Sequence, residues 1–162
     1  MKKIILTLAV VLTLSLVTSA QTFRFGIGPA ISLPVGDLSE ISSVGIGAEI
    51  TGIAEFSESF EAFAQAGYQS FAGKKIDVFG SPVKLDALNH IPIIVGARYK
   101  TGGFLLGGGI GFASWGENSS GFAYSPQIGY STGNIDIIAQ YHGTAMNGGT
   151  LSYVGVKAYY KF

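Results

Sequence analysis

The sequence predicts an all-β fold, an eight-stranded antiparallel up-and-down transmembrane β-barrel. Apolar residues alternate with small or polar ones in eight segments. Each segment has about the ten residues that a tilted strand needs to cross a bilayer, and short connections alternate with longer ones. Only 12% of the 162 residues are charged, while 48% are hydrophobic. A typical soluble protein has about 25% charged residues, so we expect most of this chain's surface to avoid water.

The N-terminus has the features of a secretory leader. Lys2 and Lys3 precede an apolar run at 4–17, which is followed by the small residues Thr18, Ser19 and Ala20. A charged start, a short apolar centre and a small-residue end are typical of a signal peptide. The apolar run is shorter than the roughly 20 residues of a membrane-spanning helix. The sequence therefore predicts a signal peptide at 1–20 and a barrel domain at 21–162.

The first half of the barrel domain contains three alternating segments, at 23–33, 44–55 and 60–69. Alternation with period two indicates strands whose two faces differ. The apolar face of the first segment comprises Phe23, Phe25, Ile27, Ile31 and Leu33. The third segment is less regular, because Phe63 falls on its polar face.

The second half adds five segments, at 90–99, 102–116, 122–130, 135–142 and 153–162. The glycine-rich stretch "GGFLLGGGIGFASWG" (102–116) resembles a flexible linker, but its large apolar residues also alternate. We expect Phe104, Leu106, Ile110 and Phe112 to face lipid and Gly107, Gly109 and Gly111 to line a narrow lumen. Leu105 is an inward-facing exception, and Trp115 is expected at the outer rim.

The connections between the segments alternate in length. Short ones are expected at 56–59, 100–103 and 131–134, and longer ones at 34–43, 70–89, 114–120 and 143–150. Short periplasmic turns and longer outer loops are the layout of outer-membrane barrels. This layout places both termini in the periplasm.

The polarity of the two faces separates a membrane barrel from a soluble one. A soluble barrel would enclose its bulky apolar residues and expose its charges. In this chain the charged and amide residues share a face with the glycines, as suits a crowded lumen. The apolar face includes aromatic residues that suit the membrane interfaces: Phe23, Tyr99, Phe104, Tyr130, Tyr141, Tyr160 and Phe162.

Several stretches resemble a known family. They are "FGIGPAISLPVGDL", "IPIIVGARYK", "SPQIGY" and the terminal "YVGVKAYYKF". With the leader, they make the chain similar to the outer-membrane β-barrel domain proteins of Bacteroidota, small barrels of OmpA/OmpX-like architecture. The resemblance covers nearly all of 21–162 and implies a bacterial outer-membrane location. Phe162 resembles the end of the C-terminal signal read by the barrel-assembly machinery, although Lys157 stands where that signal has glycine.

Other classes of site find little support. The chain has no cysteine, which excludes disulfides and thiolate chemistry. A dinucleotide fingerprint would need a third glycine where Phe112 stands, followed by a helix. The leader holds two of the ten basic residues, so the barrel domain has fewer basic than acidic side chains and no basic patch for nucleic acid.

The two histidines are the remaining candidates for chemistry. His90 and His142 are expected on the lumen face near the outer ends of their strands, but a metal site needs three or four ligands. His142 with Thr144 resembles the His and Ser of lipid A deacylases, which are also eight-stranded barrels. Glu117 is the last glutamate in the chain, and no partner is placed to orient His142. The sequence therefore predicts no enzyme, no catalytic, cofactor-binding or metal-binding residue, and no cofactor.

The lumen charges are expected to pair, because an unpaired charge is costly in a low-dielectric interior. Lys157 and Glu49 should meet across Gly26 and Gly28. A second cluster is expected toward the periplasmic end, formed by Arg24, Glu55, Glu61, Arg98, Asp136 and Lys161.

Three functions remain open. The first is a monomeric, non-catalytic outer-membrane protein that serves envelope integrity or surface interaction through its loops. The second is a narrow channel for ions or small solutes, and the third is a lipid A-modifying enzyme. The expected partners are outer-membrane lipids and lipopolysaccharide, whose phosphates could meet Lys74, Lys75 and Lys84, and the barrel-assembly machinery through Phe162.

Overall fold

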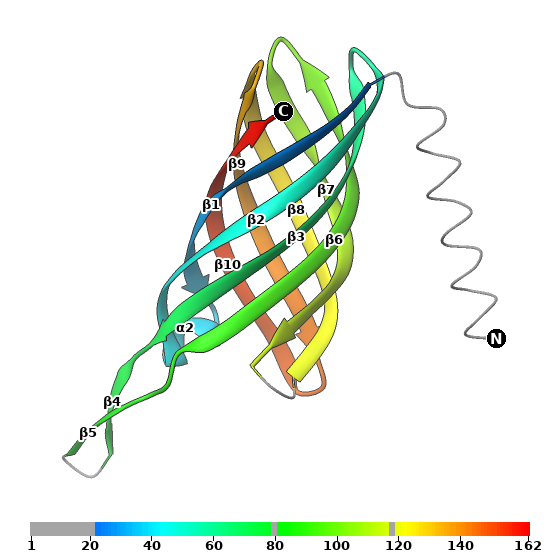
Figure 1. The fold of residues 1–162 in the computed structure, drawn as a ribbon. Helices are drawn as coiled ribbons and strands as arrows, with labels where there is room; N and C mark the ends of the chain where they lie inside the picture. The colour runs from blue at the N-terminus through cyan, green and yellow to red at the C-terminus, as the bar shows by residue number, and fades with distance from the viewer. Residues whose placement is uncertain (1–21, 79–80, 117–118) are drawn as a thin grey trace.

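The computed structural model describes residues 22–78, 81–116 and 119–162, so the predicted signal peptide at 1–20 lies outside the described residues. Eight strands close into one antiparallel barrel in the order β1-β10-β9-β8-β7-β6-β3-β2 (Figure 1). This confirms the predicted fold. The barrel strands are β1 (Thr22–Val35), β2 (Ser42–Ser57), β3 (Phe60–Gly73), β6 (Leu88–Thr101), β7 (Phe104–Trp115), β8 (Ser119–Thr132), β9 (Ile135–Met146) and β10 (Gly149–Lys161).

The two ends of the barrel differ in their connections. At one end, here named the turn end, lie the two-residue turns at 58–59, 102–103 and 133–134, the start of β1 and the end of β10 (Figure 1). At the opposite end, the loop end, lie the short helix α2 (Leu38–Ile41) and the hairpin of β4 (Lys75–Val78) and β5 (Ser81–Lys84). No helix within the described ranges has the length and apolar character needed to cross a membrane.

Two of the expected long loops are short, which corrects the expectation for 114–120 and 143–150. β9 continues to Met146 and β10 starts at Gly149, so only two residues join them. The tight turn is possible because Gly148 has a φ of 109°, which favours glycine. Both faces of these strand ends carry small and polar residues, so the sequence shows no alternation there that would predict a strand.

The expected loop at 70–89 is largely extended structure. β3 continues to Gly73, and β4 pairs with β5 in a two-stranded sheet of its own. This hairpin projects beyond the barrel at the loop end (Figure 1).

The glycine-rich stretch forms β7, with the predicted alternation. Phe104, Leu106, Ile110 and Phe112 lie on the outer wall, where 56–70% of each residue's surface is exposed. Leu105 is buried inside, as expected. Trp115 ends β7 at the loop end, where a rim position was expected. Its side chain is nevertheless only 2% exposed, because it shares the inward parity of Leu105.

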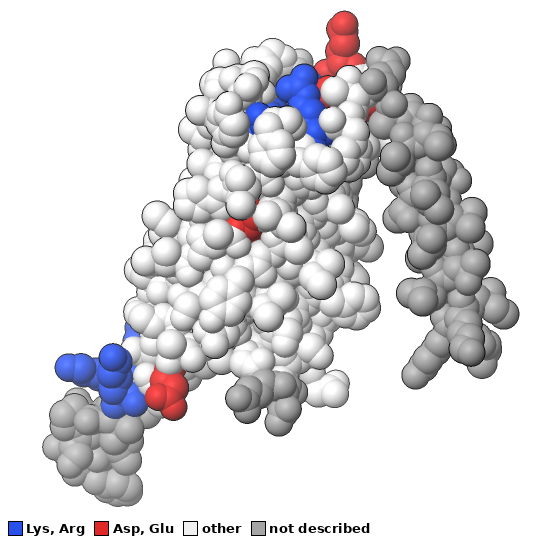
Figure 2. All heavy atoms as spheres, viewed as in Figure 1, with Lys and Arg blue, Asp and Glu red and all other residues white. Residues whose placement is uncertain are grey.

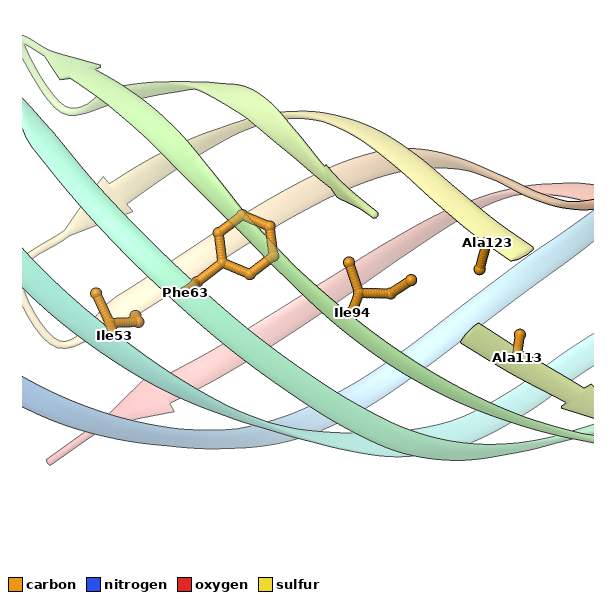
Figure 3. Close-up of a cluster of buried hydrophobic side chains, with 5 residues drawn as sticks. All are labelled: Ile53, Phe63, Ile94, Ala113 and Ala123. Carbon is orange, nitrogen blue, oxygen red and sulfur yellow. The ribbon is translucent and has the colours of Figure 1, made fainter. Parts of the chain in front are cut away.

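Apolar side chains also occupy part of the lumen. One cluster consists of Ile53, Phe63, Ile94, Ala113 and Ala123 (Figure 3). Phe63, which interrupts the alternation of its segment, therefore points inward. Its ring lies 4.0 Å from the guanidinium carbon of Arg98, an arrangement that stabilises a buried cation.

Strand packing is tightest where inward-facing glycines meet a neighbouring backbone. A Cβ on Gly28 would overlap the carbonyl oxygen of Ala158 on β10. A Cβ on Gly52, in contrast, would make one ordinary contact at 3.4 Å with the ring of Phe23.

We therefore expect Gly28→Ala to lower the free energy of unfolding by at least about 1–3 kcal/mol, the usual cost of overpacking. The measurement is urea unfolding of the barrel refolded into lipid vesicles. Gly52→Ala is the matched control and should stay within about 0.5 kcal/mol of the wild type. Equal stability of the two variants would show that β1 and β10 can separate at no cost.

Candidate functional site

An ion pair at the centre of the lumen joins strands β2 and β10. Lys157 Nζ lies 3.0 Å from Glu49 Oε2, and both side chains are almost completely buried. The register places Glu49 opposite Gly28 and Lys157 opposite Ala30. The predicted pair is confirmed, although it spans β1 at Gly28 and Ala30 rather than at Gly26 and Gly28.

Glu49 is held by three donors. Tyr159 Oη donates to Oε2 over 2.8 Å, and Gln69 Nε2 donates to Oε1 over 3.0 Å. Together with Lys157, these bonds satisfy both carboxylate oxygens, as a buried charge requires. The carboxylate is therefore saturated by fixed partners and is poorly placed to act on a ligand.

The predicted second charge cluster forms as separate pairs. Arg98 Nη1 lies 3.1 Å from Glu61 Oε1, and Lys161 Nζ lies 2.6 Å from Asp136 Oδ1. Nearer the turn end, Arg24 and Lys100 both approach Glu55. Lys100 was absent from the predicted cluster, although its inward parity with Arg98 on β6 could have indicated it.

The lumen also contains a network of amide side chains that was not predicted from the sequence. Arg98 donates from Nε and Nη2 to Gln127 Oε1 over 3.1 and 3.0 Å. Gln127 Nε2 donates in turn to Gln65 Oε1 over 3.3 Å. All three side chains are buried, so they fill the lumen between the ion pairs.

Both histidines lie inside the barrel toward the loop end, as predicted, and they meet edge to face with ring centroids 4.9 Å apart. His90 stacks on Trp115 and His142 stacks on Tyr153, with centroids 3.9 and 4.8 Å apart. Among the described residues, no group of three or more His, Asp and Glu side chains is placed to hold a metal ion. The geometry is that of a packed aromatic cluster.

His142 and Thr144 are close, but their surroundings do not suit a nucleophilic pair. His142 Nε2 lies 3.2 Å from Thr144 Oγ1, which also accepts a hydrogen bond from Trp115 Nε1 over 3.0 Å. His142 Nδ1 has no hydrogen-bond partner among the described residues, so no carboxylate there orients the ring. Both residues are buried in the lumen, away from the lipid-facing wall.

The loop end of the lumen is closed by apolar side chains. Leu38 of α2 is completely buried and packs in a cluster with Phe71, Trp115 and Tyr153. Because α2 joins β1 to β2, the chain places its own helix over the opening (Figure 1).

The outer wall is apolar between two charged ends. Figure 2 shows a viewed wall that is almost entirely white, with blue and red groups at the two ends. Wherever side-chain burial is described, the exposed charged residues lie at the ends: Asp37, Glu40, Lys74, Lys75, Lys84 and Asp86 at the loop end, and Glu58 at the turn end.

Exposed aromatic residues encircle the turn end. The group comprises Phe23, Phe25, Phe60, Tyr99, Phe104, Tyr130, Tyr160 and Phe162. Some of them contact each other, for example Phe104 and Tyr130 with ring centroids 5.1 Å apart. Such a belt is typical of a membrane–water interface. Of the predicted aromatic residues, only Tyr141 lies in the loop half, where its hydroxyl donates to Ser152 Oγ over 2.9 Å.

No protein-family model and no curated protein matches the chain. Solved structures of small outer-membrane barrels do match it. Ail of Yersinia pestis, in a phospholipid nanodisc, is 15% identical with a TM-score of 0.61, over 86% of this chain and 98% of Ail. Neisserial surface protein A is 17% identical with a TM-score of 0.53, over 86% and 97% of the two chains.

The N-terminal barrel domain of Pseudomonas aeruginosa OprF is similar at the same level. It is 16% identical with a TM-score of 0.51, over 86% of this chain and 97% of that domain. At these identities the likeness establishes the fold alone, a small eight-stranded β-barrel that these outer-membrane proteins share.

The central ion pair yields a double-mutant prediction. Lys157→Met leaves Glu49 buried without its cation, so we expect it to destabilise the barrel by about 3–5 kcal/mol. Adding Glu49→Leu removes the uncompensated charge and should recover part of that loss. Urea unfolding from lipid vesicles measures both variants.

The Lys100–Glu55 pair provides the control, because 25% and 15% of its two side chains are exposed. The corresponding Lys100→Met and Glu55→Leu replacements should cost about 0–1 kcal/mol each. Equal stability losses in Lys157→Met and the double variant would show that Glu49 carries no penalty when it is left without its cation.

Proposed function

We propose that the chain is a non-catalytic bacterial outer-membrane protein whose barrel anchors its loop end at the cell surface, for surface interaction or envelope integrity. The observation that carries the proposal is the filled lumen. Ion pairs, amides and an aromatic cluster occupy its length, and Leu38 closes the loop end. The polar surface available to partners is therefore confined to the two ends.

The orientation follows the layout of known outer-membrane barrels, with short turns in the periplasm. It places the turn end and both termini there and the β4–β5 hairpin outside. Phe162, paired with Phe25 through two backbone hydrogen bonds, supports recognition of the C-terminus by the barrel-assembly machinery. The sequence motifs quoted above support membership of the Bacteroidota family, and a monomer suffices because the barrel closes on itself.

A channel is less well supported by the same geometry. Eight strands enclose an interior that side chains just fill, and here Arg98 and Lys157 are both fixed inside it by buried acidic partners. An ion path would need these pairs to separate inside the barrel, which is costly.

The base of the hairpin is the surface best suited to an anionic partner. Lys75 lies directly opposite Lys84 in the β4–β5 ladder, and both side chains are exposed. Like charges opposite each other are destabilising, and a phosphate between them would relieve the repulsion. Lys74 lies beside them and donates to the carbonyl oxygen of Ser39. We therefore propose lipopolysaccharide phosphates as the partner.

One structural neighbour supports an anionic partner of this kind. Ail of Yersinia pestis has been solved in complex with the heparin analogue sucrose octasulfate.

The location is tested by expressing the chain with its leader in a Gram-negative host. We expect the protein in purified outer membranes, with a mobility in SDS gels that differs between heated and unheated samples, because a closed barrel resists the detergent. A soluble protein with a single mobility would contradict the location.

The surface interaction is tested by lipopolysaccharide binding at low salt. Each lysine near an anionic surface contributes about 1 kcal/mol, so replacing Lys74, Lys75 and Lys84 by Gln should weaken binding by about a hundredfold. Surface plasmon resonance on immobilised lipopolysaccharide measures it. Lys100→Gln, which removes a lysine from the turn end, is the control, and an equal loss in that variant would contradict a site on the hairpin.

A further inference from the structure

The turn end contains a polar basin that the proposed function does not use. Its volume is about 500 Å³, within the range of about 300–1,000 Å³ found for small-molecule sites. Arg24, Glu55, Lys100 and Lys161 line it, together with the hydroxyl-bearing residues Thr22 and Ser57. Charged groups gather at this end of the molecule in Figure 2.

The charges in the basin are unevenly compensated. Lys161 is neutralised by Asp136 at 2.6 Å and donates to Ser131 Oγ over 2.9 Å. Arg24 and Lys100, in contrast, share a single carboxylate oxygen, Glu55 Oε1, at 3.8 and 3.2 Å. One carboxylate cannot neutralise two cations. Glu58 also lines the basin, but within the described residues it forms no ion pair.

Arg24 has unused donors. Its nearest carboxylate contact, from Nε at 3.8 Å, is too long for a hydrogen bond. Its guanidinium makes no side-chain hydrogen bond to another described residue, and 37% of the side chain is exposed. A guanidinium presents paired N–H groups that match a carboxylate or a phosphate in two parallel bonds. Lys100 uses one N–H on Glu55 and donates from its side chain to no other described residue, which leaves two N–H groups for a ligand.

We propose that this basin is a binding site for a small anion carrying a carboxylate or a phosphate, held between Arg24 and Lys100. The ligand's negative charge balances the cation that Glu55 leaves uncompensated. Glu55 competes with the ligand for the same two side chains and so limits its affinity.

The test uses the full barrel domain, folded in detergent micelles at low salt, with two probes: inorganic phosphate and a dipeptide with a free carboxylate. Isothermal titration calorimetry should show saturable binding of at least one probe. Phosphate binding alone assigns phosphate esters as the ligand class, and dipeptide binding alone assigns carboxylates.

Variants of the basin should change the affinity for the probes in opposite directions. Arg24→Gln should weaken binding at least tenfold. Arg24→Lys keeps the charge without the paired donors, so its affinity for the probe should lie between those of Arg24→Gln and the wild type. Glu55→Gln should strengthen binding, because it releases both cations. Glu40→Gln, at the loop end, should have no effect, because Glu40 is exposed on α2.

The folded state of each variant is verified by its heat-dependent gel mobility. Three results would overturn the proposal: neither probe binds, Arg24→Gln binds as well as the wild type, or Glu40→Gln weakens binding as much as Arg24→Gln does.

Discussion

The narrowness of an eight-stranded barrel governs everything inside this protein. Once β1 and β10 pair, the interior has room for side chains and little else. A charge placed there is poorly solvated and must find a partner on another strand inside the barrel, as Lys157 on β10 does with Glu49 on β2. Where two strand backbones approach closely, as at Gly28 and Ala158, no side chain fits. The same narrowness moves any contact with other molecules to the two ends.

Much of this arrangement could be predicted from the sequence because strand faces are a local property. A period of two assigns each residue of β7 to the wall or the lumen, and even the irregular positions, Leu105 and Phe63, lie inside as their parity requires. The Glu49–Lys157 pair could also be predicted from the sequence, because an antiparallel meander fixes which strands are neighbours. Because an unpaired buried charge is costly, only a few pairings of the charged side chains in the lumen are then possible.

The rest depends on features that alternation does not encode. Met146 and Gly149 belong to strands because Gly148 permits a tight turn, while the small residues around it give no pattern. Leu38 lies in the lumen because α2 folds back over the opening, a tertiary contact without a local signal. The bonds from Arg98 to Gln127 depend on which rotamers fit among the neighbours. In the candidate site, the sequence indicated the residues that face the lumen but not the sharing of Glu55 by Arg24 and Lys100.

The position of Trp115 has a practical consequence for following how the barrel assembles. It is the only tryptophan in the chain, and its indole touches side chains from three other strands: His90 on β6, Thr144 on β9 and Tyr153 on β10. β6 is the hairpin partner of β7, but β9 and β10 lie two and three strands away from β7 in the sheet. Their side chains reach the indole only when the sheet has curled into a cylinder. The natural fluorescence of this single residue therefore reports the curling of the sheet itself, without an added dye or label.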